Sequence, residues 1–193
     1  NALDDGHLEV ATILIEQGAN VNTTNSLGET ALMKTASNGY LESVTLLIEN
    51  GADINATNIR GETALMYAVG DGKLKVVTLL IENGADIGAQ NAEGETALMY
   101  AVQYGKLKVV TFLTENGAGI GAQNKEGKTA LMYAAAYGNL EAVTLLTENG
   151  ADIGAQDKEG ETALMYAARH SGDLNVLTLL IKNGADTNAK NAK

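Results

Sequence analysis

The chain of 193 residues has no cysteine, proline or tryptophan and only one phenylalanine. Without cysteine there can be no disulfide, thiolate metal ligand or cysteine nucleophile, and the redox compartment stays undetermined. No apolar run reaches the roughly 18 residues that suggest a membrane span. Basic residues are scarce, with 13 Lys and Arg against 24 Asp and Glu and a formal net charge of -11. This charge repels nucleic acid and anionic lipid, so neither is an expected partner.

Hydrophobic residues make up 45% of the chain, which is enough for a packed core. One stretch, GAQNKEGKTA at 121–130, suggests at first a phosphate-binding loop of the form G-x-x-x-x-G-K-[ST]. Five residues separate Gly121 from Gly127, however, which is one too many for that loop. The stretch also recurs at 88–97 and 154–163 with glutamate in place of the lysine. We therefore interpret it as part of a repeat.

The period of that repeat is 33 residues, read from the motif Thr-Ala-Leu-Met. Five copies at one spacing indicate a repeat architecture whose units stack on their neighbours, because no single unit can bury its own apolar face. The five copies begin at Thr30, Thr63, Thr96, Thr129 and Thr162.

Each repeat predicts two helices, which we call the inner and the outer helix. In the repeat that contains Thr63, this threonine is the expected N-cap of the inner helix, and apolar residues follow at helical spacing. Gly72 is expected to end the inner helix, because glycine enters the left-handed region at little cost. The outer helix follows and ends at Asn83-Gly84, and a turn-rich connector leads to the next repeat.

This pattern resembles the ankyrin repeat, whose period is 33 and whose signature is T-P-L-H-x-A. The string GADINA at 51–56 matches a second element of that family. The resemblance implies an all-α solenoid of helix-turn-helix units joined by hairpin-like connectors. This chain departs from the family pattern in having alanine in place of proline and methionine in place of histidine.

The expected organisation is a single ankyrin-repeat domain over 1–193. The sixth repeat holds one extra residue near His170-Ser171, which we place in the turn between its helices. The boundaries are a partial repeat at 1–24, repeats at 25–57, 58–90, 91–123, 124–156 and 157–190, and the start of a further unit at 191–193.

The sequence offers little catalytic chemistry. Neither of the two histidines has metal-binding spacing, and we interpret His7, beside Asp4 and Asp5, as a solvated helix end. His170 precedes Ser171, but adjacent residues rarely orient their side chains towards each other, so a nucleophile pair is not expected. We predict no enzyme activity, no catalytic or metal-binding residue and no cofactor. Acid pairs that recur with the repeat are interpreted as solvated hairpin charges: Glu93 with Glu95, and Glu159 with Glu161.

The candidate partner site comes from positions that vary between otherwise similar repeats. Tyr67, Tyr100, Tyr133 and Tyr166 share one register and are expected to belong to the stack. Tyr104 and Tyr137 stand at inner-helix ends where other repeats carry Asn, Asp or His, so packing does not dictate tyrosine there. The alternative is neutral drift on a solvated surface. The predicted partner-binding residues are Ile59, Arg60, Asp71, Glu93, Gln103, Tyr104, Lys125, Glu126, Tyr137, Arg169 and His170.

The resemblance implies that these connector tips and inner-helix ends line a concave face that binds another protein. We therefore predict a protein–protein interaction module with a partner of unknown identity. Some basic or amide character is expected on the partner where it contacts Asp71 and Glu93. Two alternatives are a targeting or substrate-recruiting segment of a larger enzyme or effector, and an engineered scaffold without a natural partner. A monomer is expected, with self-association through uncapped ends as the alternative.

Overall fold

A computed structural model describes residues 8–192 of the chain, so His7, Asp4 and Asp5 lie outside the described residues. The chain divides into two compact units, unit 1 up to Ala92 and unit 2 from Glu93. The division falls near the start of the predicted repeat 91–123. The repeat boundaries and the single domain over 1–193 stay predictions, and each unit is described by itself.

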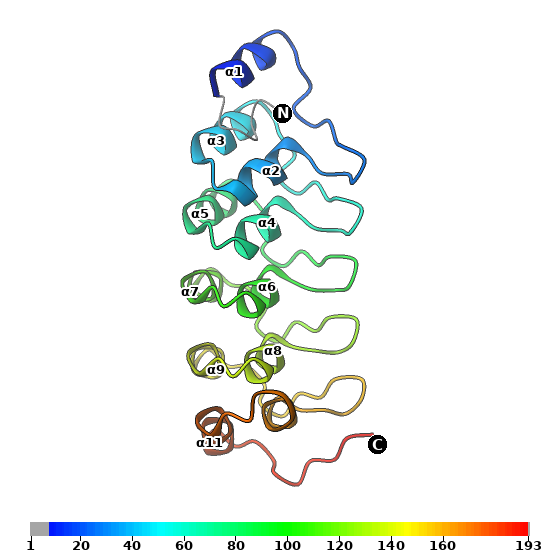
Figure 1. Ribbon diagram of the computed structural model, residues 1–193, viewed down its shortest axis with the longest axis vertical. Helices are drawn as coiled ribbons and strands as arrows, with labels where there is room; N and C mark the ends of the chain where they lie inside the picture. Colours follow the sequence, from blue (N-terminus) through cyan, green and yellow to red (C-terminus); the bar gives the residue numbers. More distant parts are fainter. Residues whose placement is uncertain (1–7, 193) are drawn as a thin grey trace. The chain divides into compact units, whose positions relative to one another are not determined.

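Unit 1 contains an outer helix followed by two inner–outer pairs within the part that the structure describes. The inner helix α2 packs against α4 and against its own outer helix α3, and α3 packs against α1 and α5. In Figure 1 the connectors project beside the inner helices, on the side away from the outer helices. The helices of unit 1 are α1 (Leu8–Glu16), α2 (Ala31–Asn38), α3 (Leu41–Glu49), α4 (Ala64–Gly70) and α5 (Leu74–Glu82).

Unit 2 repeats this arrangement. The inner helix α8 packs against α6 and α10, while the outer helix α9 packs against α7 and α11. The elements of unit 2 are α6 (Ala97–Gln103), α7 (Leu107–Glu115), α8 (Ala130–Ala136), α9 (Leu140–Glu148), α10 (Ala163–Tyr166), the π-helix η1 (Ala167–Ser171) and α11 (Leu174–Lys182).

The inner helices begin at threonine N-caps, as the sequence predicts. The Thr63 side chain accepts a hydrogen bond from the backbone N–H of Met66, which satisfies one donor that a helix start leaves without a partner. Methionine adds a contact of its own, because the Thr30 N–H donates to the Met33 sulfur at 3.5 Å. Helices of seven or eight residues are marginal alone, so packing must stabilise them.

The core consists of leucine, valine, alanine and methionine side chains between neighbouring helices. Leu65 and Met66 on α4 and Leu80 on α5 are each 1% exposed or less. The all-α repeat solenoid expected from the sequence is therefore confirmed. Between residues 8 and 192 the β-type pairing is limited to isolated bridges such as that between Thr24 and Thr30, and no helix there is long and apolar enough to cross a bilayer.

The extra residue of the sixth repeat is absorbed differently from the prediction. We placed it in the turn between the helices, but the end of the inner helix widens into the π-helix η1. An inserted residue is often accommodated in this way, since a π-turn closes with one more residue than an α-turn. Gly172 then ends the element in a left-handed conformation at φ 61°. The insertion is thus helical and moves the residues at the end of the inner helix.

Candidate functional site

The connector tips form a backbone ladder within each unit. In unit 1 the Ile59 N–H donates to the Leu27 carbonyl at 3.1 Å, and the Ala92 N–H donates to the Arg60 carbonyl at 2.7 Å. In unit 2 the Lys125 N–H donates to the Glu93 carbonyl at 2.8 Å. These bonds hold the tip backbones, so the side chains at the tips vary without loss of the connector. We call the surface made by these tips and the inner-helix ends the inner face.

Three candidate residues lie on the inner face of unit 1. Ile59 is 68% exposed, and Arg60 beside it is exposed. Asp71 is exposed at the end of α4 and accepts a hydrogen bond from the Ser37 hydroxyl at 2.6 Å. That contact leaves the carboxylate at the surface with its negative charge.

The two candidate tyrosines of unit 2 lie at the surface. Tyr104 follows α6 and is 58% exposed, and Tyr137 follows α8 and is 61% exposed. The ring of Tyr104 lies 5.9 Å from that of Tyr100, at an interplanar angle of 50°. A role for both in partner binding stays a prediction.

The tyrosines in the common register have a structural role, as expected. The Tyr67 hydroxyl reaches the preceding repeat, where it donates to the Glu29 carboxylate at 2.7 Å, and it accepts from Asn58 at 3.0 Å. Burial raises the pKa of Tyr67 to about 12, and the carboxylate of Glu29 adds to this. We call this asparagine–tyrosine–glutamate arrangement the relay.

Glu29, the acid of that relay, is buried with only 8% of its surface exposed. It accepts from Lys34 at 2.7 Å and from Asn25 at 2.7 Å, in addition to Tyr67. The hydrogen bonds from Lys34, Tyr67 and Asn25, in that order, lower the pKa of Glu29 to about 2. Burial opposes this shift but is the smaller effect.

The second acid of each recurring pair was wrongly interpreted as a solvated hairpin charge. Glu161 is 3% exposed and forms an ion pair with Arg169. Glu95 is half-buried and accepts from the Tyr133 hydroxyl at 3.1 Å and from the Gln103 amide at 3.0 Å. Only the first acids, such as Glu159, are exposed. The second acids differ because a tyrosine or a long polar side chain reaches them from an inner helix.

In the relay that the last two repeats form, the carboxylate lies on the other side of the tyrosine. Tyr133 keeps the ordinary pattern, since it accepts from Asn124 at 3.0 Å and donates to Glu95. The position of that glutamate is Lys128 in the next repeat, so Tyr166 donates instead to Asp157 at 2.7 Å. Burial acts to raise the pKa of Asp157, but the bond from Tyr166 and backbone N–H donors outweigh it, and the pKa is lowered.

A cluster of cations surrounds the Tyr166 ring. The Lys128 ammonium lies 5.6 Å and the Arg169 guanidinium carbon 5.5 Å from its centroid, both within range of a cation–π contact. The His170 ring stacks on Tyr166 at 5.8 Å and 18°, and the Arg169 Nε–H donates to His170 at 3.2 Å. Ser171 does not pair with this histidine; its hydroxyl donates to the Ala135 carbonyl at 3.1 Å.

Two grooves open beside this cluster. A groove of about 220 Å³ brings the predicted residues Tyr137 and His170 together, and it is lined also by Lys128, Met132, Tyr133, Ala136 and Tyr166. A neighbouring groove of about 470 Å³ brings Lys125 and Glu126 together with Arg169 and His170. Sequence reasoning missed Lys128, although its departure from the glutamate register is visible in the sequence.

Not every predicted residue has its polar group available to a partner. The Gln103 amide is engaged with Glu95, and the Arg169 guanidinium with Glu161. Glu126 accepts an ion pair from Lys128 at 2.6 Å while its side chain stays 66% exposed. Glu93 is exposed at its tip. Among residues 8–192 no three His, Asp or Glu side chains are grouped to hold a metal ion.

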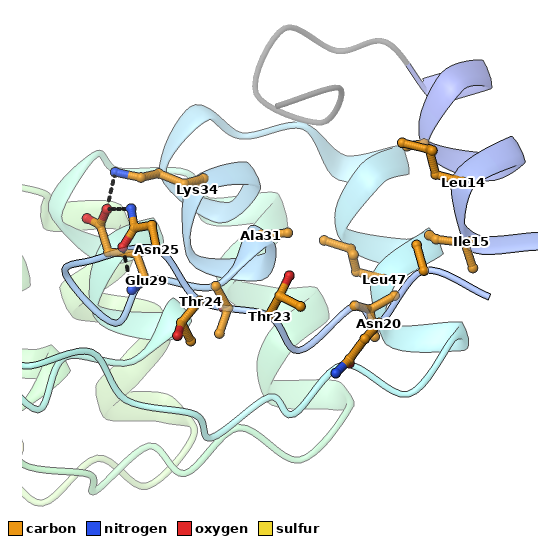
Figure 2. Close-up of a pocket in the computed structure, with 14 residues that line it drawn as sticks. Leu14, Ile15, Asn20, Thr23, Thr24, Asn25, Glu29, Ala31, Lys34 and Leu47 are labelled. Atoms are coloured by element: carbon orange, nitrogen blue, oxygen red, sulfur yellow. Dashed lines mark hydrogen bonds and ion pairs between the residues drawn. The ribbon is translucent and has the colours of Figure 1, made fainter. Parts of the chain in front are cut away.

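A further hollow of about 490 Å³ lies in unit 1 between α1, α2 and α3. In Figure 2, Leu14, Ile15 and Leu47 line one part of it, and Glu29 lies at another with its bonds to Lys34 and Asn25. Ala31, on its wall, is half-buried, whereas the equivalent Ala64 and Ala130 are 1% exposed under a preceding inner helix. The hollow thus corresponds to a helix-packing face of the repeat.

Stacked helix pairs with hydrogen-bonded connectors define the chain as a helical repeat protein. Comparison with protein families agrees with this: a model described as ankyrin repeats (3 copies) matches residues 55–124 and 98–191. A second, described as ankyrin repeats (many copies), matches residues 14–68. The chain belongs to the ankyrin repeat family, whose members are generally protein–protein interaction modules and typically not enzymes. No curated protein matches the chain.

Proposed function

We propose that this chain binds a protein partner through its inner face. The observation that carries the proposal is the exposure of Tyr104 and Tyr137, at 58% and 61%, beside a relay tyrosine such as Tyr166 that is 7% exposed. Tyrosine is intermediate in burial among the residue types, and exposed tyrosines, which combine a large ring with a hydroxyl, are frequent hot spots in interfaces. Neither tyrosine is needed to fill the core, so the exposed rings are explained by a partner that covers them.

The connector tips extend this surface within each unit. In unit 1, Ile59 offers apolar area and Arg60 a cation, while Asp71 suits a basic or amide group of the partner. In unit 2, the carboxylate of Glu93 suits the same chemistry, and Lys125 supplies a cation. A footprint of mixed apolar, aromatic and charged groups is typical of protein interfaces that form and dissociate.

The proposal is tested by photo-crosslinking in cells of the organism that makes the chain. A benzophenone amino acid replaces Tyr104 or Tyr137 in turn, and as a control it replaces Lys108, which is exposed on the outer helix α7 of the same unit. Covalent adducts with another protein are expected from the two inner-face positions. Adducts formed equally or only from the control would overturn the assignment of the face.

The energetic test uses the double variant Tyr104→Ala/Tyr137→Ala and the partner identified by crosslinking. Loss of one hot-spot side chain often costs about 2 kcal/mol or more, so we expect at least ~10-fold weaker binding. The melting temperature should change little, because both rings are exposed. A variant that binds normally contradicts the proposal. A variant that melts several degrees earlier would instead assign the tyrosines to the repeat packing.

A further inference from the structure

Two linked substitutions in unit 2 break the register that the other repeats keep. The residue before each inner-helix threonine is Glu29, Glu62, Glu95 and Glu161 in four repeats but Lys128 in the fifth. The residue four positions before this glutamate or lysine is asparagine in the other repeats, whereas it is Asp157 in the sixth. The two changed residues belong to one relay, since both lie around Tyr166.

The exchange leaves the relay intact. Elsewhere tyrosine donates to the glutamate and accepts from the asparagine, as Tyr133 does with Glu95 and Asn124. Around Tyr166 the carboxylate has moved to the other side, where Asp157 accepts the hydroxyl proton at 2.7 Å. Because the tyrosine has a charged acceptor in either arrangement, the hydrogen bond of Tyr166 does not itself require a cation at position 128.

The exchange does alter the charge of the smaller groove beside Tyr166. Lys128 lines the groove of about 220 Å³ together with Tyr137, Tyr133 and His170. The neighbouring groove adds Lys125, Lys158 and Arg169, and its lining also includes the carboxylates of Glu126, Asp157, Glu159 and Glu161, so the added positive charge is concentrated in the smaller groove. Clefts that hold drug-sized ligands usually span about 300–1,000 Å³, so the smaller groove suits one side chain.

The Lys128 ammonium already has one partner, but that partner is replaceable. Glu126 contacts it at 2.6 Å with a side chain that is 66% exposed, whereas Lys128 itself is 27% exposed. An ion pair with so exposed a carboxylate contributes little to stability. A carboxylate in the groove would lie beside an ammonium whose side chain is 27% exposed, where solvent screens the attraction less than at an open surface. An incoming acid can therefore displace Glu126 or share Lys128 with it.

We propose that this groove takes an aspartate or glutamate side chain of the protein partner. Lys128 neutralises the carboxylate, the Tyr137 hydroxyl and the His170 ring offer polar contacts at the rim, and Met132 and Ala136 line the apolar wall. The proposal rests on the proposed function and makes it more specific. It adds an acidic residue of the partner to the basic or amide groups that suit Asp71 and Glu93.

The test uses random dodecapeptides displayed on phage as the probe. Selection on the whole chain is followed by counter-selection on the double variant Lys128→Glu/Asp157→Asn. That variant restores the glutamate and asparagine that flank Tyr67, at Glu29 and Asn58, so Tyr166 keeps a carboxylate acceptor and the melting temperature should stay close to that of the parent. The control Lys108→Glu makes the same lysine-to-glutamate substitution on the outer helix α7, and it makes the net charge more negative than the double variant does.

Peptides that bind the parent but not the double variant are expected to share an Asp or Glu. Replacing that residue by Asn or Gln should weaken binding at least ~10-fold, and Lys108→Glu should leave binding within about twofold. The net charge of -11 favours basic peptides in general, so an acidic consensus cannot arise from non-specific attraction.

Two outcomes separate this inference from the proposed function. If selected peptides bind parent and double variant equally but lose affinity for Tyr104→Ala, the inner face binds protein and the acid-specific groove is refuted. If peptide binding depends on neither Lys128 nor Tyr104, both proposals fail. A double variant that melts much earlier would show that the cation serves the fold, which also overturns the inference.

Discussion

Replacing Tyr67 by phenylalanine tests whether the relay stabilises the stack. The change removes one hydroxyl, which donates to Glu29 at 2.7 Å and accepts from Asn58 at 3.0 Å, and it keeps the ring. Glu29 still has Lys34 and Asn25 as donors after the change. The substitution therefore isolates one charge-assisted hydrogen bond between two repeats.

The magnitude follows from the pKa of Glu29. The drop from the usual 4.5 to about 2 corresponds to ~3 kcal/mol at about 1.4 kcal/mol per pKa unit, shared among Lys34, Tyr67 and Asn25. Lys34 is 38% exposed, so solvent screening reduces the total. A hydrogen bond to a charged group is worth about 1.5–3 kcal/mol at most sites, and we expect Tyr67→Phe to cost about 1–2 kcal/mol at pH 7.

The pH dependence gives the sharper test. Because the folded pKa of Glu29, about 2, lies below the unfolded value of 4.5, its stabilisation is present above about pH 5 and is lost as pH falls towards 2. The difference between parent and variant in urea unfolding should therefore shrink over the acid range. Tyr40→Phe is the control, since the structure shows no hydrogen bond from that hydroxyl within residues 8–192. A cost equal at pH 7 and pH 2, or equal in the control, would refute the reasoning.

Three further outcomes are expected. In urea unfolding, Leu80→Ala should cost about 2–5 kcal/mol because it empties a site that is 0% exposed, whereas Leu174→Ala, at a site 76% exposed, should cost less than about 0.5 kcal/mol. Gly117→Ala should cost about 1 kcal/mol from its positive φ alone, and Gly94→Ala clearly more, because its new Cβ would meet the Lys125 nitrogen at 2.8 Å. In hydrogen exchange by mass spectrometry, α1 and α11 should exchange faster than α3 and α9, since several of their apolar side chains are about half exposed or more; equal protection would indicate that a second chain covers the ends.

The fold can be predicted well from the sequence because the motif that begins each inner helix occurs five times. Each threonine that precedes Ala-Leu-Met becomes an N-cap, and each glycine after an inner helix enters the left-handed region, as at Gly72. These features depend on neighbours in sequence and on a period, both of which can be read directly. Repetition also averages out local ambiguity, since a helix predicted weakly in one copy is supported by the others.

The sequence fails where side chains act between repeats. Nothing local shows that the Tyr67 hydroxyl reaches Glu29, 38 residues earlier, so the second acids are mistaken for solvated charges. The extra residue near Ser171 is misplaced for a related reason. Whether an insertion enters a turn or widens a helix depends on packing, and here the Ser171 hydroxyl is held by the Ala135 carbonyl of the preceding inner helix.

The relay also explains which departures from the register carry functional information. A change at one relay position alone would leave a buried charge or hydroxyl without its partner, at a cost of about 1–3 kcal/mol, so single changes there are disfavoured. Lys128 and Asp157 differ from the other repeats together, in a combination that keeps Tyr166 bonded to a carboxylate. The connector tips, by contrast, are held through their backbones, and their side chains vary singly. A paired change at a constrained position is therefore stronger evidence for a selected surface than a single change at a tip, which places Lys128 above Ile59 or Arg60 as the first residue to test.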